Sequence, residues 1–483
     1  MMRSLYSGVS GLRVHQTKMD VIGNNISNVN TVGFKASSVT FSDILYQTTK
    51  SASGPNATTG TAGTNAMQVG LGANLASITT SITQTGGSQR TDNPFDLMIE
   101  GDGFFVVNNG NGNYFTKAGS FNVDAAGTLC TPTGATVMGW QPDPEDPTRT
   151  VADTVSPLKI MSAENLYSAP EATTEAYLHG NIDSMDTALT SAAGKVVVIS
   201  FFDNVGNSYN AELKITQDTE SADGNVGNYL VSLTNVYDKN GDSIFVQKVT
   251  EDDGTVTYSE TNITQVTFGS DGNTFDATVN EDGTVTLEGE AVALAFDTAT
   301  GKFKSVGEEE GGKSVTLGVI SEGGPFKDIN VDFSSLTMFS NSGKTTVEST
   351  KGNKETGAGA GKEVGNMSGV SIDLQGKIFG VYDNGDQRLL GQVVVATFSN
   401  AAGLEAIGNN MFAATQNSGE FNGIGEDVTA AGGKFTTGVL EMSNVDLSAQ
   451  FTEMITTQRG FQANSRIITT SDTLLEELIN LKR

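Results

Sequence analysis

Side chains that commonly do chemistry are scarce in this sequence. Its 483 residues include two histidines and one cysteine. The spacings HExxH, CxxC and GxSxG do not occur, so metalloprotease, dithiol and serine-hydrolase signatures are missing. The cysteine, Cys130, lies at an apolar position of an expected strand, which favours a buried, inert thiol over a reactive thiol used for cross-linking. We therefore predict no catalytic residues and a protein that is not an enzyme.

One short acidic segment resembles a calcium loop without completing it. Asp238, Asn240 and Asp242 alternate like the first ligands of an EF-hand, but Val249 stands where that loop needs a glutamate. The flanking strand patterns favour a hairpin turn here. Nothing singles out a carboxylate pair among the 56 acidic residues. We predict no metal ion, cofactor or small-molecule substrate.

The charge is strongly negative and unevenly distributed. A formal net charge of −28 repels nucleic acid and anionic lipid, so neither is an expected partner. Both ends are near neutral, and the middle of the chain carries almost all of the charge. No run reaches the roughly 18 apolar residues of a membrane helix, and the N-terminus lacks the apolar core of a cleavable secretory signal. The chain is expected to stay in the cytosol or to leave by a route that does not cut it.

The elements that would position any site begin and end with helices. Seven-residue repeats of apolar residues predict one helix at each end, packed as in a coiled coil. The alternative to coiled-coil packing is that these are two ordinary amphipathic helices of a small bundle. The N-terminal repeat consists of Leu5, Leu12, Met19 and Ile26, and the C-terminal repeat consists of Leu447, Met454, Phe461, Ile468 and Leu475, widened by Phe451.

Polar residues mark the start of the C-terminal helix. Ser443 or Asn444 is expected to cap it, because short polar side chains accept hydrogen bonds from the free amides of the first turn. Glu441, Asp446 and Glu453 lie near the same end, where negative charge favours the helix dipole.

Between the helices the sequence is strand-rich and divided by polar linkers. Residues 47–69 indicate a flexible link or an extended arm. Turn signals occur at Asn240-Gly241, Asp253-Gly254, Asp271-Gly272, Asp282-Gly283 and Asn384-Gly385. We predict a multidomain, mainly β fold of nested antiparallel β domains, with N- and C-terminal α-helices forming a coiled-coil inner domain. The predicted parts are the N-terminal helix (1–32), a linker arm (33–70), a first half (71–148) of a flanking β domain, an outer β-rich insert (149–348) of one or two subdomains, a linker (349–368), the second half (369–438) of the flanking domain, and the C-terminal helix (439–483).

Four segments together resemble the bacterial flagellar rod and hook family. NNISNVNTVGFK (24–35) and SNVDLSAQFTEMITTQRGFQANSRIITT (443–470) are similar to its paired terminal signatures. NPFDLMIEGDGFFVV (93–107) with YFTKAGSF (114–121), and LLGQVVVATFSNAAGLEAIGNNMFAAT (389–415), resemble the two halves of its flanking domain. The match covers about half of the chain, and the segments occur in the family's order.

The resemblance implies a structural subunit of the flagellar hook, a curved tube that acts as a universal joint and transmits motor torque to the filament. The alternative is the distal rod, or drive shaft, but rod proteins lack so large an insert. The implied partners are copies of the chain itself, distal rod, hook cap and hook–filament junction proteins, and the export apparatus. The implied location is extracellular, reached without a cleaved signal peptide.

The resemblance also assigns roles to residues. In addition to the two apolar repeats, it places Asn24, Asn25, Asn28, Gly33 and Phe34 at the packing surface between subunits. Some members of the family are joined covalently through a cysteine and a lysine. Only Cys130 could supply the sulfur in this chain.

Overall fold

The computed structural model divides into two compact units, which are described separately. It describes residues 2–55, 60, 62–218, 227–250, 256–269, 273–307, 309, 311–320 and 324–481. Unit 1 comprises residues 1–166, 368–381 and 387–483, and unit 2 comprises residues 167–367 and 382–386. The turns expected at Asp253-Gly254 and Asp271-Gly272 lie outside the described residues.

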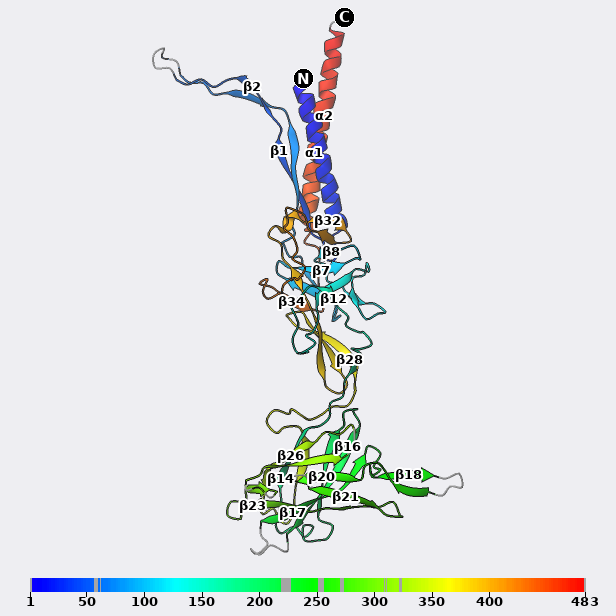
Figure 1. Ribbon diagram of the computed structural model, residues 1–483. Coiled ribbons are helices and arrows are strands. Elements are labelled where there is room, and N and C mark those ends of the chain that lie inside the picture. Colours follow the sequence, from blue (N-terminus) through cyan, green and yellow to red (C-terminus); the bar gives the residue numbers. More distant parts are fainter. Residues whose placement is uncertain are drawn as a thin grey trace. The chain divides into compact units, whose positions relative to one another are not determined.

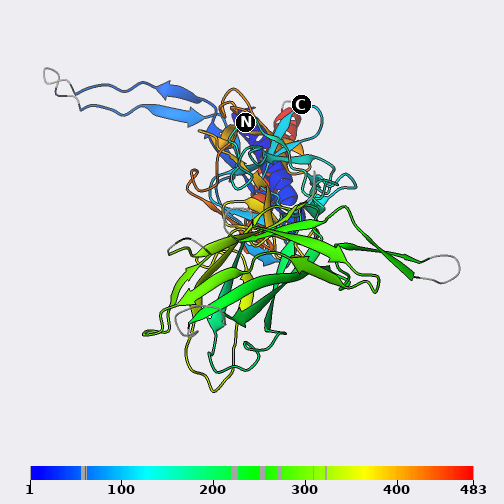
Figure 2. The same cartoon turned by 60° about the horizontal axis from the view of Figure 1, so that its bottom comes forward.

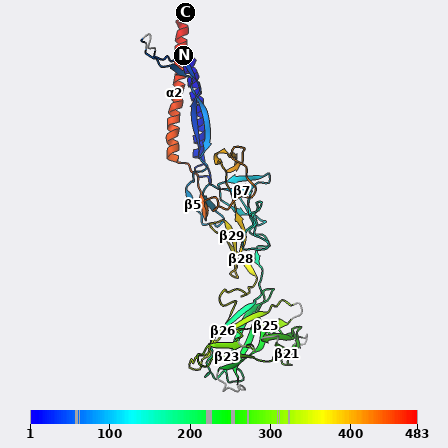
Figure 3. The same ribbon diagram turned by 60° about the vertical axis from the view of Figure 1, so that its left-hand side comes forward.

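Unit 1 contains both helices, α1 (Met2–Ser27) and α2 (Leu447–Asn480), which lie side by side (Figures 1 and 3). The start of α2 differs from the prediction, because Asp446 caps it: its side chain accepts hydrogen bonds from the amides of Ser448 and Ala449. The chain leaves α1 through turns, with the amide of Asn28 donating to the carbonyl of Asn24 at 3.2 Å.

After α1 the chain forms a long two-stranded arm (37–80). It consists of β1 (Ser37–Asp43) paired with β4 (Ala73–Thr80), and of β2 (Tyr46–Lys50) paired with β3 (Met67–Gly70). Figure 2 shows both strands of this arm, in blue. Both pairs are antiparallel. The polar segment 47–69 is thus an extended arm in its described residues, with strand at both of its ends.

The rest of unit 1 is a β domain built from two separate stretches of chain. Its main sheet has the strand order β28-β29-β30-β11-β7-β8-β33-β32. The first stretch supplies β5 (Ser88–Arg90), β6 (Leu97–Glu100), β7 (Phe104–Asn108), β8 (Asn113–Thr116), β9 (Asn122–Val123), β10 (Leu129–Cys130), β11 (Thr136–Trp140) and β12 (Ser156–Pro157). The second stretch begins with β28 (Gly365–Ile372). It continues with β29 (Lys377–Tyr382), β30 (Gln387–Val393), β31 (Val395–Ala396), the 3-10 turn η1 (Ala401–Gly403), β32 (Glu405–Gly408), β33 (Met411–Ala413), β34 (Lys434–Thr437) and β35 (Val439–Glu441).

Trp140, the only tryptophan of the chain, lies in the core of this domain. It packs in one cluster with Phe104 and Phe115, and its indole nitrogen donates to the carbonyl oxygen of Ile424 at 2.8 Å. Because Phe104 and Ile424 come from the two separate stretches, tryptophan fluorescence reports on their association in unit 1.

Unit 2 is a pair of β-sheets around one core. One sheet has the order β22-β21-β20-β25-β26-β14-β27, and the other has the order β15-β16-β17-β23-β24. The first contains β14 (Glu175–Asn181), β20 (Gln265–Gly269), β21 (Thr274–Val279), β22 (Val285–Glu288), β25 (Ser314–Ile320), β26 (Ile329–Thr337) and β27 (Glu348–Lys351). The second contains β15 (Lys195–Phe202), β16 (Ser208–Gln217), β17 (Asn228–Asp238), β23 (Val292–Phe296) and β24 (Phe303–Val306). A separate hairpin joins β18 (Val246–Thr250) to β19 (Val256–Glu260), and β13 (Tyr167–Ser168) pairs with the start of β28.

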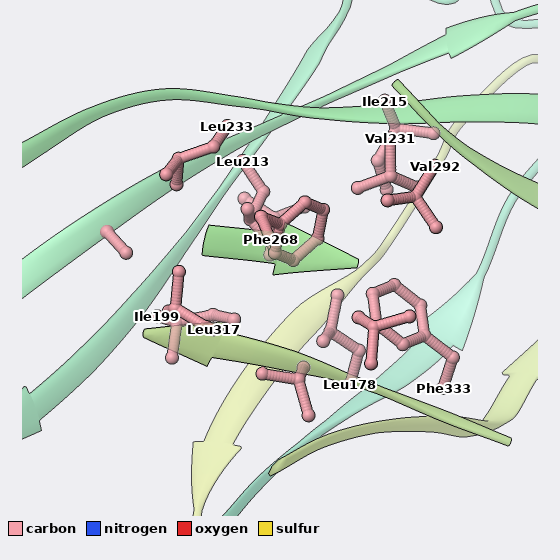
Figure 4. Packing of buried hydrophobic residues seen from close by; sticks show 14 of the residues in the cluster. Leu178, Ile199, Leu213, Ile215, Val231, Leu233, Phe268, Val292, Leu317 and Phe333 are labelled. Atoms are coloured by element: carbon pink, nitrogen blue, oxygen red, sulfur yellow. The ribbon is translucent and has the colours of Figure 1, made fainter. Parts of the chain in front are cut away.

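Alternating side chains of these strands fill the core of unit 2 (Figure 4). Leu213 and Ile215 of β16 and Phe268 of β20 are fully buried, as the two-residue period of a half-buried strand requires. One pair of strands, β14 and β26, is parallel. The class predicted from the sequence, nested and mainly antiparallel β domains with terminal helices, is confirmed.

Candidate assembly surface at the paired chain ends

The two helices approach each other closely along one face. A Cβ added at Gly8 would lie 3.2 Å from the side chain of Ile468, and one added at Gly11 would lie 2.6 Å from that of Asn464. On α2, a Cβ added at Gly460 would meet the ring of His15 at 2.7 Å. Glycines on both helices therefore permit this packing.

The members of the predicted apolar repeats are only partly covered by this contact. Val14 and Ile22 are buried in α1, whereas all four members of the N-terminal repeat are half-buried. In α2, the half-buried members are Met454, Phe461, Ile468 and Leu475, and the exposed members are Leu447 and Phe451. Each helix thus uses only part of its apolar surface against the other.

Much apolar surface of the helices remains exposed. On α2, the exposed fraction is 50% for Phe451, 60% for Ile455 and 51% for Leu474. Apolar area of this extent marks a surface that binds a partner. The full set of large exposed apolar residues in α1 and α2 is Met2, Tyr6, Val9, Leu447, Phe451, Ile455, Ile467, Leu474, Leu478 and Ile479.

The arm has a similar surface. A two-stranded ribbon has no interior of its own, so its apolar side chains stay in contact with solvent. The large exposed apolar residues of the arm are Phe41, Ile44, Leu45, Tyr46, Met67, Val69, Leu75 and Ile78.

Asparagine side chains join α1, the arm and the segment before α2. Asn25 is 1% exposed, and its amide group donates to the carbonyl of Ser37 at 2.8 Å and to Oε1 of Gln450 at 3.1 Å. Asn444 accepts a hydrogen bond from the amide of Ala36 at 2.7 Å. Asn444, which was expected to cap α2, thus ties the two chain ends together instead. We call this region the joint, and its core residues are Asn25, Lys35, Lys117, Glu441 and Asn444.

The other asparagines of the N-terminal signature have local roles. Asn28 donates its side-chain amide to Oδ1 of Asn24 at 2.8 Å, on the exposed side of the helix end. Gly33 is buried, and its amide donates to the carbonyl of Glu441 at 2.8 Å. Phe34, the next residue, is half-buried.

We expect Gly33→Ala to lower the free energy of unfolding of unit 1 by more than about 2 kcal/mol. Gly33 has a φ of +70°, a left-handed conformation that costs a residue with a β-carbon about 1–2 kcal/mol. The new Cβ would also stand 2.6 Å from the backbone nitrogen of Ala118. Urea unfolding followed by Trp140 fluorescence measures the change.

The matched control is Gly134→Ala. Gly134 has a φ of +87°, but a Cβ added there would meet no atom within 4 Å. Gly134→Ala keeps the backbone strain and lacks the clash, so it should lower the free energy of unfolding clearly less than Gly33→Ala does. Equal losses in the two variants would contradict the packing described at Gly33.

The joint contains a buried ion pair that connects residues distant in the sequence. Nζ of Lys35 lies 2.7 Å from Oε1 of Glu441, and each side chain is 1% exposed. The same ammonium donates to the carbonyl of Gln84, and the amide of Gly86 donates to Oε1 of Glu441. Glu441 was expected to favour the dipole of the last helix, but it lies before the helix in β35 and is bound by Lys35 instead.

Lys117 is a second buried cation near this pair. It is 4% exposed, donates to the carbonyl of Gly101 at 2.8 Å, and places its Nζ 5.0 Å from the ring centre of Phe104. Burial, above all, lowers the pKa of Lys117 to about 8, although the charge of Glu441 acts in the opposite direction. No local sequence pattern marks this cluster, because a single lysine or glutamate is usually exposed.

Other kinds of site find no support in the described residues. They contain no group of three or more histidine, cysteine, aspartate or glutamate side chains able to hold a metal ion. Neither α1 nor α2, within the same residues, has the long apolar stretch that crossing a bilayer requires. Asp238 accepts the amides of Asn240 and Asp242 in a turn between β17 and β18, as expected for a hairpin.

Three family models match this chain. The model "Flagella basal body rod protein" matches residues 5–35, "Flagellar hook protein FlgE/F/G D1 domain" matches 98–165, and "Flagellar basal body rod FlgEFG protein C-terminal" matches 436–481. These matches contain Lys35, Lys117 and Glu441, respectively.

Curated proteins are similar over the whole chain. The flagellar hook protein FlgE of Borreliella burgdorferi is 37% identical, and that of Treponema pallidum is 33% identical; each alignment covers 100% of both chains. The flagellar basal-body rod protein FlgG of Bacillus subtilis is 27% identical, again over 100% of both chains.

Proposed function

The chain belongs to the flagellar hook protein family, and we propose that its paired terminal helices are the surface through which copies polymerise into the hook. As a member, it is a structural subunit of the bacterial flagellum. The observation that carries the proposal is the apolar surface of α2, which remains exposed although α1 already packs against the helix. Helices of further copies are the partner that such a surface fits best.

The residues proposed for packing between copies fall into two groups. The half-buried repeats of α1 and α2 set the spacing of the pair, while Phe451 and Leu447 lie on its exposed side. Asn24, Asn25, Asn28, Gly33 and Phe34 form the turn and the joint that orient the pair. The exposed apolar residues of the arm offer a second surface that braces neighbouring copies.

Unit 2 suits the outer face of a tube that bends. It holds most of the acidic excess of the chain, and exposed charged surfaces form contacts of only about 0–1 kcal/mol each. Contacts of this strength break and re-form as copies slide, while the helices hold. This is how we propose that the hook acts as a universal joint; dry, hydrophobic contacts between the outer units would contradict it.

Further partners and the location follow from the same membership as proposals. They are the distal rod, hook cap and hook–filament junction proteins, and an export apparatus that delivers the chain to the cell exterior without cutting it. The predicted domain boundaries belong to the same proposal, with 1–32 and 439–483 as the inner tube and 149–348 as the outer insert.

An epitope inserted between Asn240 and Gly241 tests the function. This turn is exposed, and a Cβ added at Gly241 meets no atom within 4 Å, so the insertion should not disturb unit 2. Immunogold electron microscopy of purified flagella should label the short curved segment between filament and cell body, with an untagged strain as control. Label confined to the straight rod would support the distal rod instead, and absence of label from all flagellar structures would reject both.

Covalent joining through Cys130 is a separate, minor proposal. The thiol is half-buried, and burial together with Asp124 raises its pKa, so little of the reactive thiolate forms at neutral pH. If it is used, boiling-resistant multimers on a denaturing gel should disappear in Cys130→Ser. Absence of multimers from the unmodified hook would end this proposal.

A further inference from the structure

Three ionisable side chains meet in the interior of unit 1 with unequal charge. Lys35, Lys117 and Glu441 are 3%, 4% and 1% exposed. Two ammonium groups thus share one carboxylate in a region closed to water. Lys35 makes the direct ion pair with Oε1 of Glu441.

The contacts of Lys117 are weaker than those of Lys35. They are the carbonyl of Gly101 and the face of Phe104, and neither carries a full charge. Oε2 of Glu441 is buried without a hydrogen-bond partner among the described residues, so the carboxylate is not saturated. The charged groups that act on Lys117 are Glu441, Lys35 and Asp102.

We propose that this cluster makes the stability of the joint respond to pH, with the joint tightening when Lys117 releases its proton in mildly alkaline solution. Loss of that proton leaves Lys35 and Glu441 as a balanced pair. It also removes the cost of keeping a second ammonium away from water. The neutral amine can still donate a hydrogen bond to Gly101.

The direction of the effect follows from linkage. The pKa of Lys117 is about 8 in the folded chain, against 10.5 for an ordinary lysine. Between these values the unfolded chain binds more protons than the folded chain, so stability rises with pH. Below pH 8 both forms hold the proton, and the penalty is at its largest. From pH 7 to pH 9 the folding equilibrium constant of unit 1 should therefore rise about tenfold.

The three charged residues of the cluster come from three separate segments, each in or next to a segment that resembles the family. Lys35 ends the N-terminal signature, Lys117 lies within YFTKAGSF, and Glu441 lies two residues before the C-terminal signature. The three segments are far apart in the chain and converge on one buried point. A change of charge there acts on α1, the β domain and the entry to α2 together.

Urea unfolding of the full chain at pH 7, 8 and 9, followed by Trp140 fluorescence, tests the proposal. In the unmodified chain, the folding equilibrium constant should rise about tenfold from pH 7 to pH 9. Lys117→Met should be more stable than the unmodified chain at pH 7. Its stability should not rise from pH 7 to pH 9. Lys117→Arg, which stays charged throughout, should lose the gain as well, so the test survives if one variant fails to fold.

Lys159→Met is the control, because Lys159 is an exposed lysine of the same unit. It should keep the gain. All the variants retain Cys130, whose pKa is raised by burial, so any effect of this thiol cancels in the comparison. Equal dependence on pH in the unmodified chain and in both Lys117 variants would overturn the proposal, which does not depend on polymerisation.

Discussion

Lys35→Met should lower the free energy of unfolding of unit 1 by about 3–5 kcal/mol, the usual cost of leaving one member of a buried ion pair without its partner. Glu441 would then have no direct ion pair at 1% exposure, and Lys117 would remain only as a nearby charge. One carboxylate oxygen is bound to the amide of Gly86, and the other has no hydrogen-bond partner among the described residues. Urea unfolding of the full chain, read by Trp140 fluorescence at pH 7, measures the loss.

The double variant Lys35→Met with Glu441→Leu should recover most of that loss. Apolar side chains of similar volume often replace a buried ion pair without cost, although the amide of Gly86 would lose its acceptor. Arg90→Met is the control, because Arg90 and Asp92 form a fully exposed pair, and it should leave the unfolding curve unchanged. A double variant as unstable as Lys35→Met would show that the charges are needed for more than mutual neutralisation.

Ile455→Ala should raise the critical concentration for polymerisation by about 10- to 100-fold. Ile455 is 60% exposed, so the isolated chain loses little when the side chain is shortened. In the polymer the side chain would be buried, and burial of an isoleucine is worth about 1.5–3 kcal/mol. Sedimentation of polymer from monomer over a range of concentrations gives the critical value.

The matched control for this variant is Ile320→Ala. Ile320 is also exposed, at 44%, but it lies at the end of β25 in unit 2. Its substitution should leave the critical concentration within about twofold, because outer contacts are expected to be weak. An equal rise of the critical concentration in the two variants, or a loss of monomer stability in Ile455→Ala, would contradict the proposal that α2 is the assembly surface.

The sequence was most informative where the signal was local. Apolar repeats located α1 and α2, since a helix face depends on residues only a few positions apart. The Asn384-Gly385 signal lies between β29 and β30, which form an antiparallel hairpin. The parallel pairing of β14 with β26 was not foreseen, because a crossover of more than a hundred residues separates the two strands.

The core of the joint could not be predicted in this way. Lys35 and Glu441 are separated by 406 positions, and nothing beside either residue marks it as buried. The cap of α2 was also misjudged, because Asn444 and Asp446 have equal local propensity. Asn444 is occupied by hydrogen bonds to Ala36 and Ser81, which flank the arm, so Asp446 is left to cap the helix.

The strand pairing that opens and closes unit 2 has a consequence for how such a chain can diversify. Tyr167 pairs with Asn366 and Ser168 with Gly365, so the insert begins and ends at neighbouring points. The cost of closing a loop rises only slowly with its length, so a segment held in this way can be lengthened, shortened or exchanged. Unit 2 can therefore change in size and in chemistry without a change in the helices or in the buried charges of unit 1.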